Sequence, residues 1–229
     1  MQKIALIGGF DKTDLILYMA KILSILKKKV LFIDSTLTAK SRYIVPTMTP
    51  AQKYVSTFDG IDVAIGFANM KEINEYLSTT SRGEYDIVLF DVDNPVHYIN
   101  FGFGPGDQHY IITTFDVYSV SRAINVFRAF REPTKVTKVL FTKDTESRES
   151  EYLDFVSQNY KVEWEKNIIF FPFDTEDLYQ IYQNQRNARV KLSGLSMDYI
   201  DSLSYFVESA TGLSHGDVKK AMKMIEREG

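Results

Sequence analysis

A pair of glycines near the start of the chain is followed three residues later by a lysine and a threonine, in the order Gly8, Gly9, Lys12 and Thr13. Two glycines let the backbone approach an anion, and the helical pattern that follows offers free N–H groups at its N-terminus. Lys12 is long enough to reach phosphate oxygens, and the Thr13 hydroxyl suits Mg²⁺. Because the segment does not fit the strict G-x-x-x-x-G-K-S/T pattern, a glycine turn before an ordinary helix stays open as the alternative.

Two aspartates follow apolar runs of strand length further along the chain. Asp34 ends the run VLFID, and Asp91 ends the run YDIVLFD. Ligands of an open parallel sheet bind at the carboxyl ends of its strands, so both carboxylates are expected beside the glycine pair. Either aspartate alone is explained as well by a turn or a helix cap. Three such features in order, each after a predicted strand, favour one shared binding site.

The elements that must position these residues are short apolar strands separated by helical patterns. Strands buried on both faces indicate parallel βαβ units, and right-handed crossovers then cover an open sheet on both sides. The sequence therefore predicts an α/β fold with a mostly parallel central sheet and helices on both faces. The expected strands are 4–7, 30–33, 87–90, 110–113, 136–141 and 168–171; the expected helices are 15–26, 69–77, 117–130 and about 146–158, with a loop at 35–52 and a largely helical remainder.

Length and composition fit one sizeable domain. The chain has 229 residues, of which 45% are apolar, and a net charge of −3 that gives no general attraction to nucleic acid. It contains no cysteine, and the histidines His97, His109 and His215 lack the spacing of metal ligands. With no signal peptide pattern and no apolar run of about 18–20 residues, the protein is expected in the cytoplasm. We expect a main domain at 1–211 and a helical tail at 212–229.

The segment GGFDKTD resembles the deviant phosphate loop K-G-G-x-G-K-T-T of the MinD/ParA family of P-loop ATPases. The resemblance continues in order over about residues 1–210, and it implies the fold of that family with ATP or ADP and Mg²⁺ as cofactors. The implied nucleotide-binding residues are Gly8, Gly9, Asp11, Lys12, Thr13 and Asp91. Of these, Thr13 and Asp91 would hold Mg²⁺. Asp34 stands in the acidic pair that organises the attacking water and is the implied catalytic residue.

The chain departs from the family pattern at positions that matter for hydrolysis. Ile7 replaces the extra lysine that reaches the partner's nucleotide, Asp11 replaces a loop glycine, and Thr36 replaces the second acid of the pair. A carboxylate at Asp11 turned toward phosphate oxygens 4 Å away would cost roughly 4 kcal/mol at an effective dielectric constant of about 20. We therefore expect weak or absent ATP hydrolysis, with nucleotide weakly held or no cofactor at all.

The resemblance also implies a homodimer that pairs face to face across its nucleotide sites. In that case Ile7 would bring no unpaired charge into the interface, and Phe10 would add apolar area to it. Alternatively, Ile7 ends the first strand inside the core and Phe10 covers the loop of its own monomer. Arg186, Arg189 and Lys191 form a small basic cluster that is either a DNA contact or a solvated helix face.

The tail has an apolar face with lysines beside it, as in SHGDVKKAMKMIEREG. It would contact a membrane peripherally, or dock on its own domain or on a partner protein. The leading hypothesis is a divergent MinD/ParA-like protein that organises or positions a chromosome or plasmid, a pilus, a secretion system or flagellar machinery through dimerisation and partner binding. The alternatives are an active Mg²⁺-dependent ATPase of the same family and a nucleotide-free α/β adaptor.

Overall fold

A computed structural model describes residues 1–47, 52–80, 82–142 and 149–227. One eight-stranded sheet forms the centre of the molecule, in the order β3-β4-β2-β5-β1-β6-β7-β8. Every neighbouring pair is parallel except β3 and β4, which form an antiparallel hairpin at one edge. The strands are β1 (Gln2–Ile7), β2 (Val30–Asp34), β3 (Tyr54–Phe58), β4 (Ile61–Ile65), β5 (Ile87–Val92), β6 (Gln108–Thr113), β7 (Thr134–Thr142) and β8 (Val162–Pro172).

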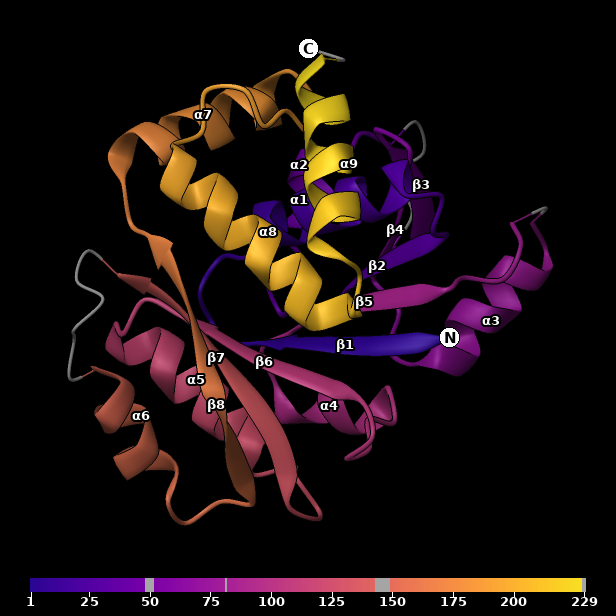
Figure 1. Ribbon diagram of the computed structural model, residues 1–229. Helices are drawn as coiled ribbons and strands as arrows, with labels where there is room; N and C mark the ends of the chain where they lie inside the picture. The colour runs from indigo at the N-terminus through magenta and orange to yellow at the C-terminus, as the bar shows by residue number, and fades with distance from the viewer. Residues whose placement is uncertain (48–51, 81, 143–148, 228–229) are drawn as a thin grey trace.

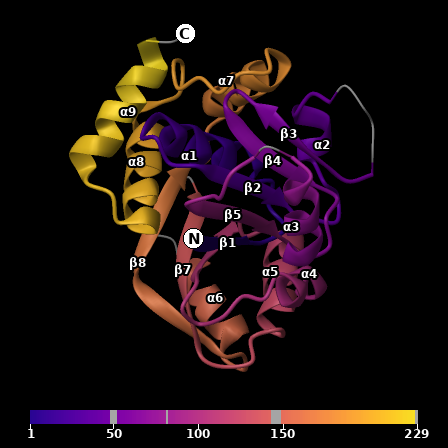
Figure 2. The same ribbon diagram turned by 90° about the vertical axis from the view of Figure 1, so that its right-hand side faces the viewer.

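Helices cover both faces of this sheet (Figure 1). One face is covered by α1 (Thr13–Ile25), α7 (Thr175–Arg186), α8 (Met197–Thr211) and α9 (His215–Arg227), whose apolar residues share one core cluster. The other is covered by α3 (Met70–Ser78), α4 (Pro95–Asn100), α5 (Val117–Phe127) and α6 (Glu149–Ser157). Figure 2 shows the two layers from the side, with α2 (Ser41–Ile44) near the hairpin edge. The predicted α/β architecture is confirmed.

The central strands are buried along nearly their whole length because both faces are covered. All of β2 and β5 is buried, and in β1 the residues from Ile4 to Ile7 are fully buried. The near-continuous apolar runs of the sequence reflect this position, because alternating polar residues would have no solvent to face. β1 lies between β5 and β6, so the loop after β1 opens at the middle of the sheet's carboxyl edge.

The hairpin β3–β4 and two short helices have no counterpart among the expected elements. Asp59 and Gly60 form its turn with φ of 46° and 82°, the left-handed conformation that a two-residue hairpin turn requires. α4 follows β5 in a stretch for which no element was expected, with Asn94 as its N-cap. α2 lies inside the expected loop 35–52, of which 48–51 fall outside the described residues, as do the first residues of the helix expected at 146–158.

The C-terminal helix α9 packs into the main core. α8 ends at Gly212 in the left-handed conformation, which lets the chain turn back. The buried side chains of α9 are Val218, Ala221, Met222 and Ile225, and they contact the cluster formed with α1 and α8. The apolar face of the tail is therefore covered by its own chain. Within the described residues, no helix has the length and apolar character needed to cross a membrane.

Candidate functional site

The loop between β1 and α1 is tightly packed at both of its glycines. Gly8 has a φ of 142°, and a Cβ atom there would lie 2.4 Å from the carbonyl oxygen of Ile112 in β6. A Cβ atom on Gly9 would lie 2.7 Å from Cγ of Arg122, a residue of α5. A larger residue at either position would collide with these neighbours. The fold itself thus requires the glycine pair, independently of any anion that the loop binds.

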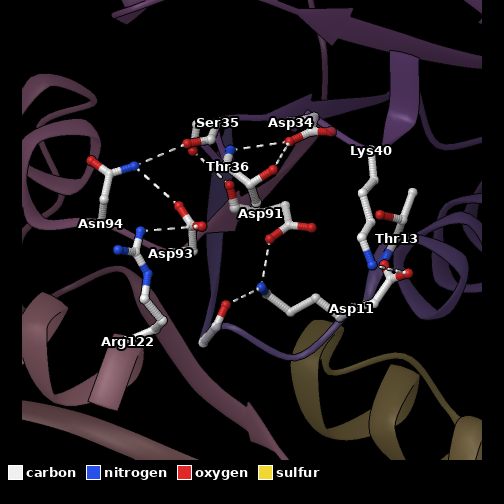
Figure 3. Close-up of polar contacts among 12 residues, drawn as sticks. Asp11, Thr13, Asp34, Ser35, Thr36, Lys40, Asp91, Asp93, Asn94 and Arg122 are labelled. Atoms are coloured by element: carbon white, nitrogen blue, oxygen red, sulfur yellow. Dashed lines mark hydrogen bonds and ion pairs between the residues drawn. The ribbon is translucent and has the colours of Figure 1, made fainter. Parts of the chain in front are cut away.

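The Lys12 side chain is buried and meets the carboxylate of Asp91, a residue that Figure 3 labels. Its Nζ lies 2.6 Å from Oδ1 of Asp91 and donates a 2.6 Å hydrogen bond to the carbonyl oxygen of Gly8. Lys12 is 1% exposed and Asp91 is 2% exposed. Burial raises the pKa of the Asp91 carboxyl, and the Lys12 ammonium acts in the opposite direction. The cation expected to bind phosphate is therefore paired with the carboxylate expected to bind Mg²⁺.

Asp11 contacts the loop that follows β2. Its Oδ2 lies 2.8 Å from Nζ of Lys40, and its Oδ1 accepts a 3.3 Å hydrogen bond from the backbone N–H of Thr13 at the start of α1. Asp11 has a negative φ, so it fits the loop without the backbone strain that replacing a glycine can cause. Lys40 balances the charge of Asp11. Asp11 therefore repels a phosphate less strongly than the isolated carboxylate that was considered from the sequence.

The carboxylate of Asp34, the expected catalytic residue, accepts hydrogen bonds from the loop that contains Lys40. Its Oδ1 accepts hydrogen bonds from the backbone N–H and the hydroxyl of Thr36, at 3.0 Å and 2.7 Å, and its Oδ2 accepts one of 2.9 Å from the N–H of Ser41. Asp34 is 2% exposed. These contacts fix the loop's position, and they leave the carboxylate little capacity to orient a water molecule.

Sequence reasoning missed three residues at this site: Lys40, Asp93 and Arg122. Asp93 accepts the backbone N–H of Leu37 at 3.1 Å and lies 3.3 Å from Nη2 of Arg122. Arg122 therefore links α5 to the loop after β5, with its stem over Gly9. The D-x-D spacing of Asp91 and Asp93 was a usable signal, because residues two positions apart at a strand end point to the same side. The sequence around Arg122 and Lys40 gave no signal of their contacts with Asp93 and Asp11.

Two cavities adjoin the loop. The first, of about 130 Å³, is lined by the expected phosphate-binding residues together with side chains from neighbouring loops: Gly8, Gly9, Phe10, Asp11, Lys12, Thr13, Thr36, Thr38, Lys40, Asp91, Asp93 and Tyr118. We call it the phosphate cavity. The second, of about 270 Å³, is lined by aromatic and apolar side chains with several aspartates, and we call it the aromatic cavity. Phe10, Asp11 and Lys40 line both cavities, so the Asp11–Lys40 pair lies where the two meet.

The expected ligands of Mg²⁺, Thr13 and Asp91, both line the phosphate cavity. A threonine hydroxyl and a carboxylate are oxygen donors of the kind that Mg²⁺ prefers. The Asp91 carboxylate, however, is held by Lys12 and has almost no exposed surface. Among the described residues, no group of three or more histidine, aspartate and glutamate side chains could hold a metal ion. By type these residues fit a magnesium–phosphate complex, but Lys12 would have to leave Asp91 before the carboxylate could take part in one.

The other sequence expectations have mixed outcomes. Ile7 is fully buried in β1, and the Phe10 ring lies 4.7 Å from the ring of Phe141 in its own chain. Ile7 therefore ends the first strand inside the core, as the alternative stated, and is too deeply buried for an interface, whereas Phe10 packs against its own chain and is half-buried. In the basic cluster, Arg186 and Arg189 are exposed at the end of α7 and after it, and Lys191 is half-buried.

Asp14, in the first turn of α1, lines the aromatic cavity. Burial raises the pKa of its carboxyl to about 7; a 2.7 Å hydrogen bond from Nε2 of Gln185 lowers the pKa, and the charge of Asp11 raises it further. An aspartate with a pKa near 3.9 when unfolded binds more protons in the folded state. The stability it contributes is therefore complete below about pH 4 and is lost as the pH rises through about 7.

The Asp14→Asn variant is expected to match the wild type near pH 4 and to be more stable at pH 8, because asparagine still accepts the Gln185 hydrogen bond but carries no charge. Urea unfolding at both pH values measures the difference. Asp116 is the control, since hydrogen bonds from Ser119 and Thr114 outweigh its slight burial and lower its pKa; Asp116→Asn should lose stability at pH 8. An Asp14→Asn effect that does not change with pH would contradict this reading.

Comparisons with known proteins bear on the fold. No family model matches the sequence, and a search of curated proteins gives no match. Among solved structures, a Cyanothece McdA–ATP complex is similar at 13% identity over 93% of this chain and 97% of that one, with a TM-score of 0.53. The MinD cell division protein of Aquifex aeolicus is similar at 17% identity over 93% and 98%, with a TM-score of 0.49. A plasmid partition protein of Borrelia burgdorferi bound to AMPPNP is similar at 13% identity over 98% and 99%, with a TM-score of 0.46. The similarity to McdA shows that the chain has the fold of the MinD/ParA-like P-loop ATPases.

Proposed function

We propose that this chain, which has a MinD/ParA-like P-loop fold, is a divergent protein of that kind that organises or positions a cellular assembly by dimerising and binding partners, with weak or no ATP hydrolysis. Proteins of similar fold include a cell division protein and a plasmid partition protein. The chromosome or plasmid, pilus, secretion system and flagellum remain the candidate cargoes, since they follow from analogy of fold.

The buried ion pair between Lys12 and Asp91 is the observation that most strongly supports weak ATP hydrolysis. A triphosphate with Mg²⁺ needs a free lysine and a free aspartate, and here each neutralises the other at 2.6 Å. Separating two buried charges leaves each of them without compensation until the ligand arrives. The loss of the extra lysine at Ile7 also removes a positive group that would stabilise charge during phosphoryl transfer.

An active Mg²⁺-dependent ATPase is the second candidate, and one observation favours it. The expected ligands Gly8, Gly9, Lys12, Thr13 and Asp91 line a single cavity at the carboxyl edge of the sheet. If a nucleotide supplied enough binding energy to draw Lys12 from Asp91, every ligand would be in reach. The nucleotide-free adaptor differs from both candidates in needing no ligand at this cavity.

Exposed apolar side chains beside the phosphate cavity support the proposed dimer. Leu37, Val117 and Tyr118 are 64%, 81% and 58% exposed. Tyr118 lines the cavity, Val117 precedes it in α5, and the N–H of Leu37 is bound by Asp93 at the cavity wall. Apolar and aromatic residues of this kind form the centres of protein interfaces. They take the place of Ile7 and Phe10 in the proposed interface.

Sedimentation over a range of protein concentrations is expected to show a monomer–dimer equilibrium both with and without Mg-ATP, because the apolar residues are exposed without a ligand. Val117→Asp should shift the equilibrium to monomer by placing a charge in the interface. Phe155→Asp on α6 is the matched control, since Phe155 is 67% exposed on a helix away from the cavity and should leave the dimer intact. A strict monomer under every condition would discard the dimer and favour the adaptor.

A further inference from the structure

The loop after β2 brings one cation to the junction of the two cavities. Lys40 lines both the phosphate cavity and the aromatic cavity, and in Figure 3 its side chain reaches across to Asp11 in the loop before α1. Lys12, the other lysine of the phosphate cavity, is committed to Asp91. Lys40 is thus the accessible positive charge of the phosphate cavity, with its side chain 49% exposed.

The position of Lys40 is fixed by its own loop. Asp34 accepts hydrogen bonds from Thr36 and from the N–H of Ser41, and the Thr36 hydroxyl accepts one of 3.1 Å from the N–H of Ala39. These bonds enclose the residues on both sides of Lys40 in one compact turn. The ammonium group is therefore presented at the cavity junction by a backbone that is held from the buried end of β2.

Asp11 occupies the groups that an incoming anion would use. Its carboxylate pairs with Lys40 at 2.8 Å and accepts the N–H of Thr13, one of the free donors at the N-terminus of α1. Free N–H groups and a nearby cation are what a helix N-terminus offers to a phosphate. The carboxylate is thus an anion supplied by the chain itself. Since the pair is half-exposed, with Asp11 at 35%, it is weak enough to be displaced.

We infer that Lys40 is an anion-binding residue for the phosphate groups of a nucleotide, and that its ion pair with Asp11 keeps it from binding them until the pair separates. The inference rests on the proposed function, because it concerns the same site. The Asp11–Lys40 ion pair then contributes to weak nucleotide binding, and replacing the Asp11 side chain would free Lys40 to bind phosphate. Asp11 and Lys40 then act as one unit, so the effect of replacing Lys40 depends on whether Asp11 is charged.

A double-mutant cycle read by calorimetry with Mg-ATP tests this dependence. Asp11→Asn removes the charge and keeps an oxygen for the N–H of Thr13, and it should tighten Mg-ATP binding at least about tenfold. Lys40→Met alone should change binding by less than about threefold, since Lys40 is already paired. The double variant Asp11→Asn/Lys40→Met should return to about the wild-type affinity. Inorganic pyrophosphate should follow the same order, because the phosphates are the groups recognised.

Lys53 and Glu72 provide a matched control pair. They are 47% and 30% exposed, their ion pair is 2.7 Å long, and Glu72 also accepts a backbone N–H, from Ala68. Glu72→Gln and Lys53→Met make the same charge changes away from the cavities and should leave binding unchanged. Thermal unfolding of all variants should stay close to the wild type, because both pairs are at the surface.

Three results would overturn the inference: equal effects of Lys40→Met with and without Asp11, Mg-ATP binding by the double variant as tight as by Asp11→Asn, or no binding of Mg-ATP by any variant. The last leaves the proposed function intact, because a protein that positions its cargo without nucleotide is part of it. Conversely, rapid hydrolysis by the wild type would contradict the proposed function and leave the cycle to decide the role of Lys40.

Discussion

Replacing Asp91 with alanine is expected to lower the free energy of unfolding by about 3–5 kcal/mol at pH 8. The reason is that Lys12 would remain in the protein as a buried cation, 1% exposed, with the carbonyl oxygen of Gly8 as its nearest described partner. For a chain of this size, such a loss lowers the melting temperature by roughly 6–20 °C. Thermal and urea unfolding measure it directly.

A second substitution separates the lone charge from the lost volume. Lys12→Met in the Asp91→Ala background removes the uncompensated cation and should restore most of the stability, because apolar residues can replace a buried ion pair at little cost. Asp201 is the control aspartate: its pair with Lys219 is at the surface, and Asp201→Ala should cost less than about 1 kcal/mol. A double variant as unstable as Asp91→Ala alone would show that the cavity, not the charge, causes the loss.

The sequence predicted the sheet and its site edge because both depend on local patterns. Buried parallel strands need continuous apolar runs, and Asp34 and Asp91 mark the points where two of them end. The hairpin β3–β4 was missed although its Asp59–Gly60 turn is a strong local signal. Polar residues interrupt the apolar runs of its two short strands, so they are weaker as a pattern than the runs of the central sheet, and they contribute only the antiparallel edge.

The state of the site could not be predicted, because it depends on which side chains meet across the fold. Lys12 and Asp91 are 79 positions apart, since 91 minus 12 is 79, and only the register of β1 beside β5 brings them together. The same holds for Asp11 with Lys40 and for Gly9 with Arg122. From sequence, Asp11 was a bare charge facing phosphate, whereas its balance by Lys40 comes from the loop after β2. The residue types identified the site, whereas the three-dimensional contacts determined which of its charged side chains are paired.

Wild-type protein is expected to turn over Mg-ATP far more slowly than the ~1 per second of an ordinary ATPase. Three features in and around the phosphate cavity act together in this direction. Lys12 and Asp91 neutralise each other, both oxygens of Asp34 are held by the loop after β2, and Ile7 is a buried apolar residue in place of a lysine. Each removes a group needed to bind Mg²⁺, orient water or stabilise developing charge.

Steady-state phosphate release at saturating Mg-ATP, compared between the wild type and Lys12→Ala, is the most direct test of the claim that the site is neutralised from within. Lys12→Ala removes the lysine on which phosphate binding would depend, and contaminating activity does not respond to it. We predict that both proteins release phosphate at the same low background rate. Turnover by the wild type at about 1 per second or faster, abolished in Lys12→Ala, would contradict the account and establish an active ATPase.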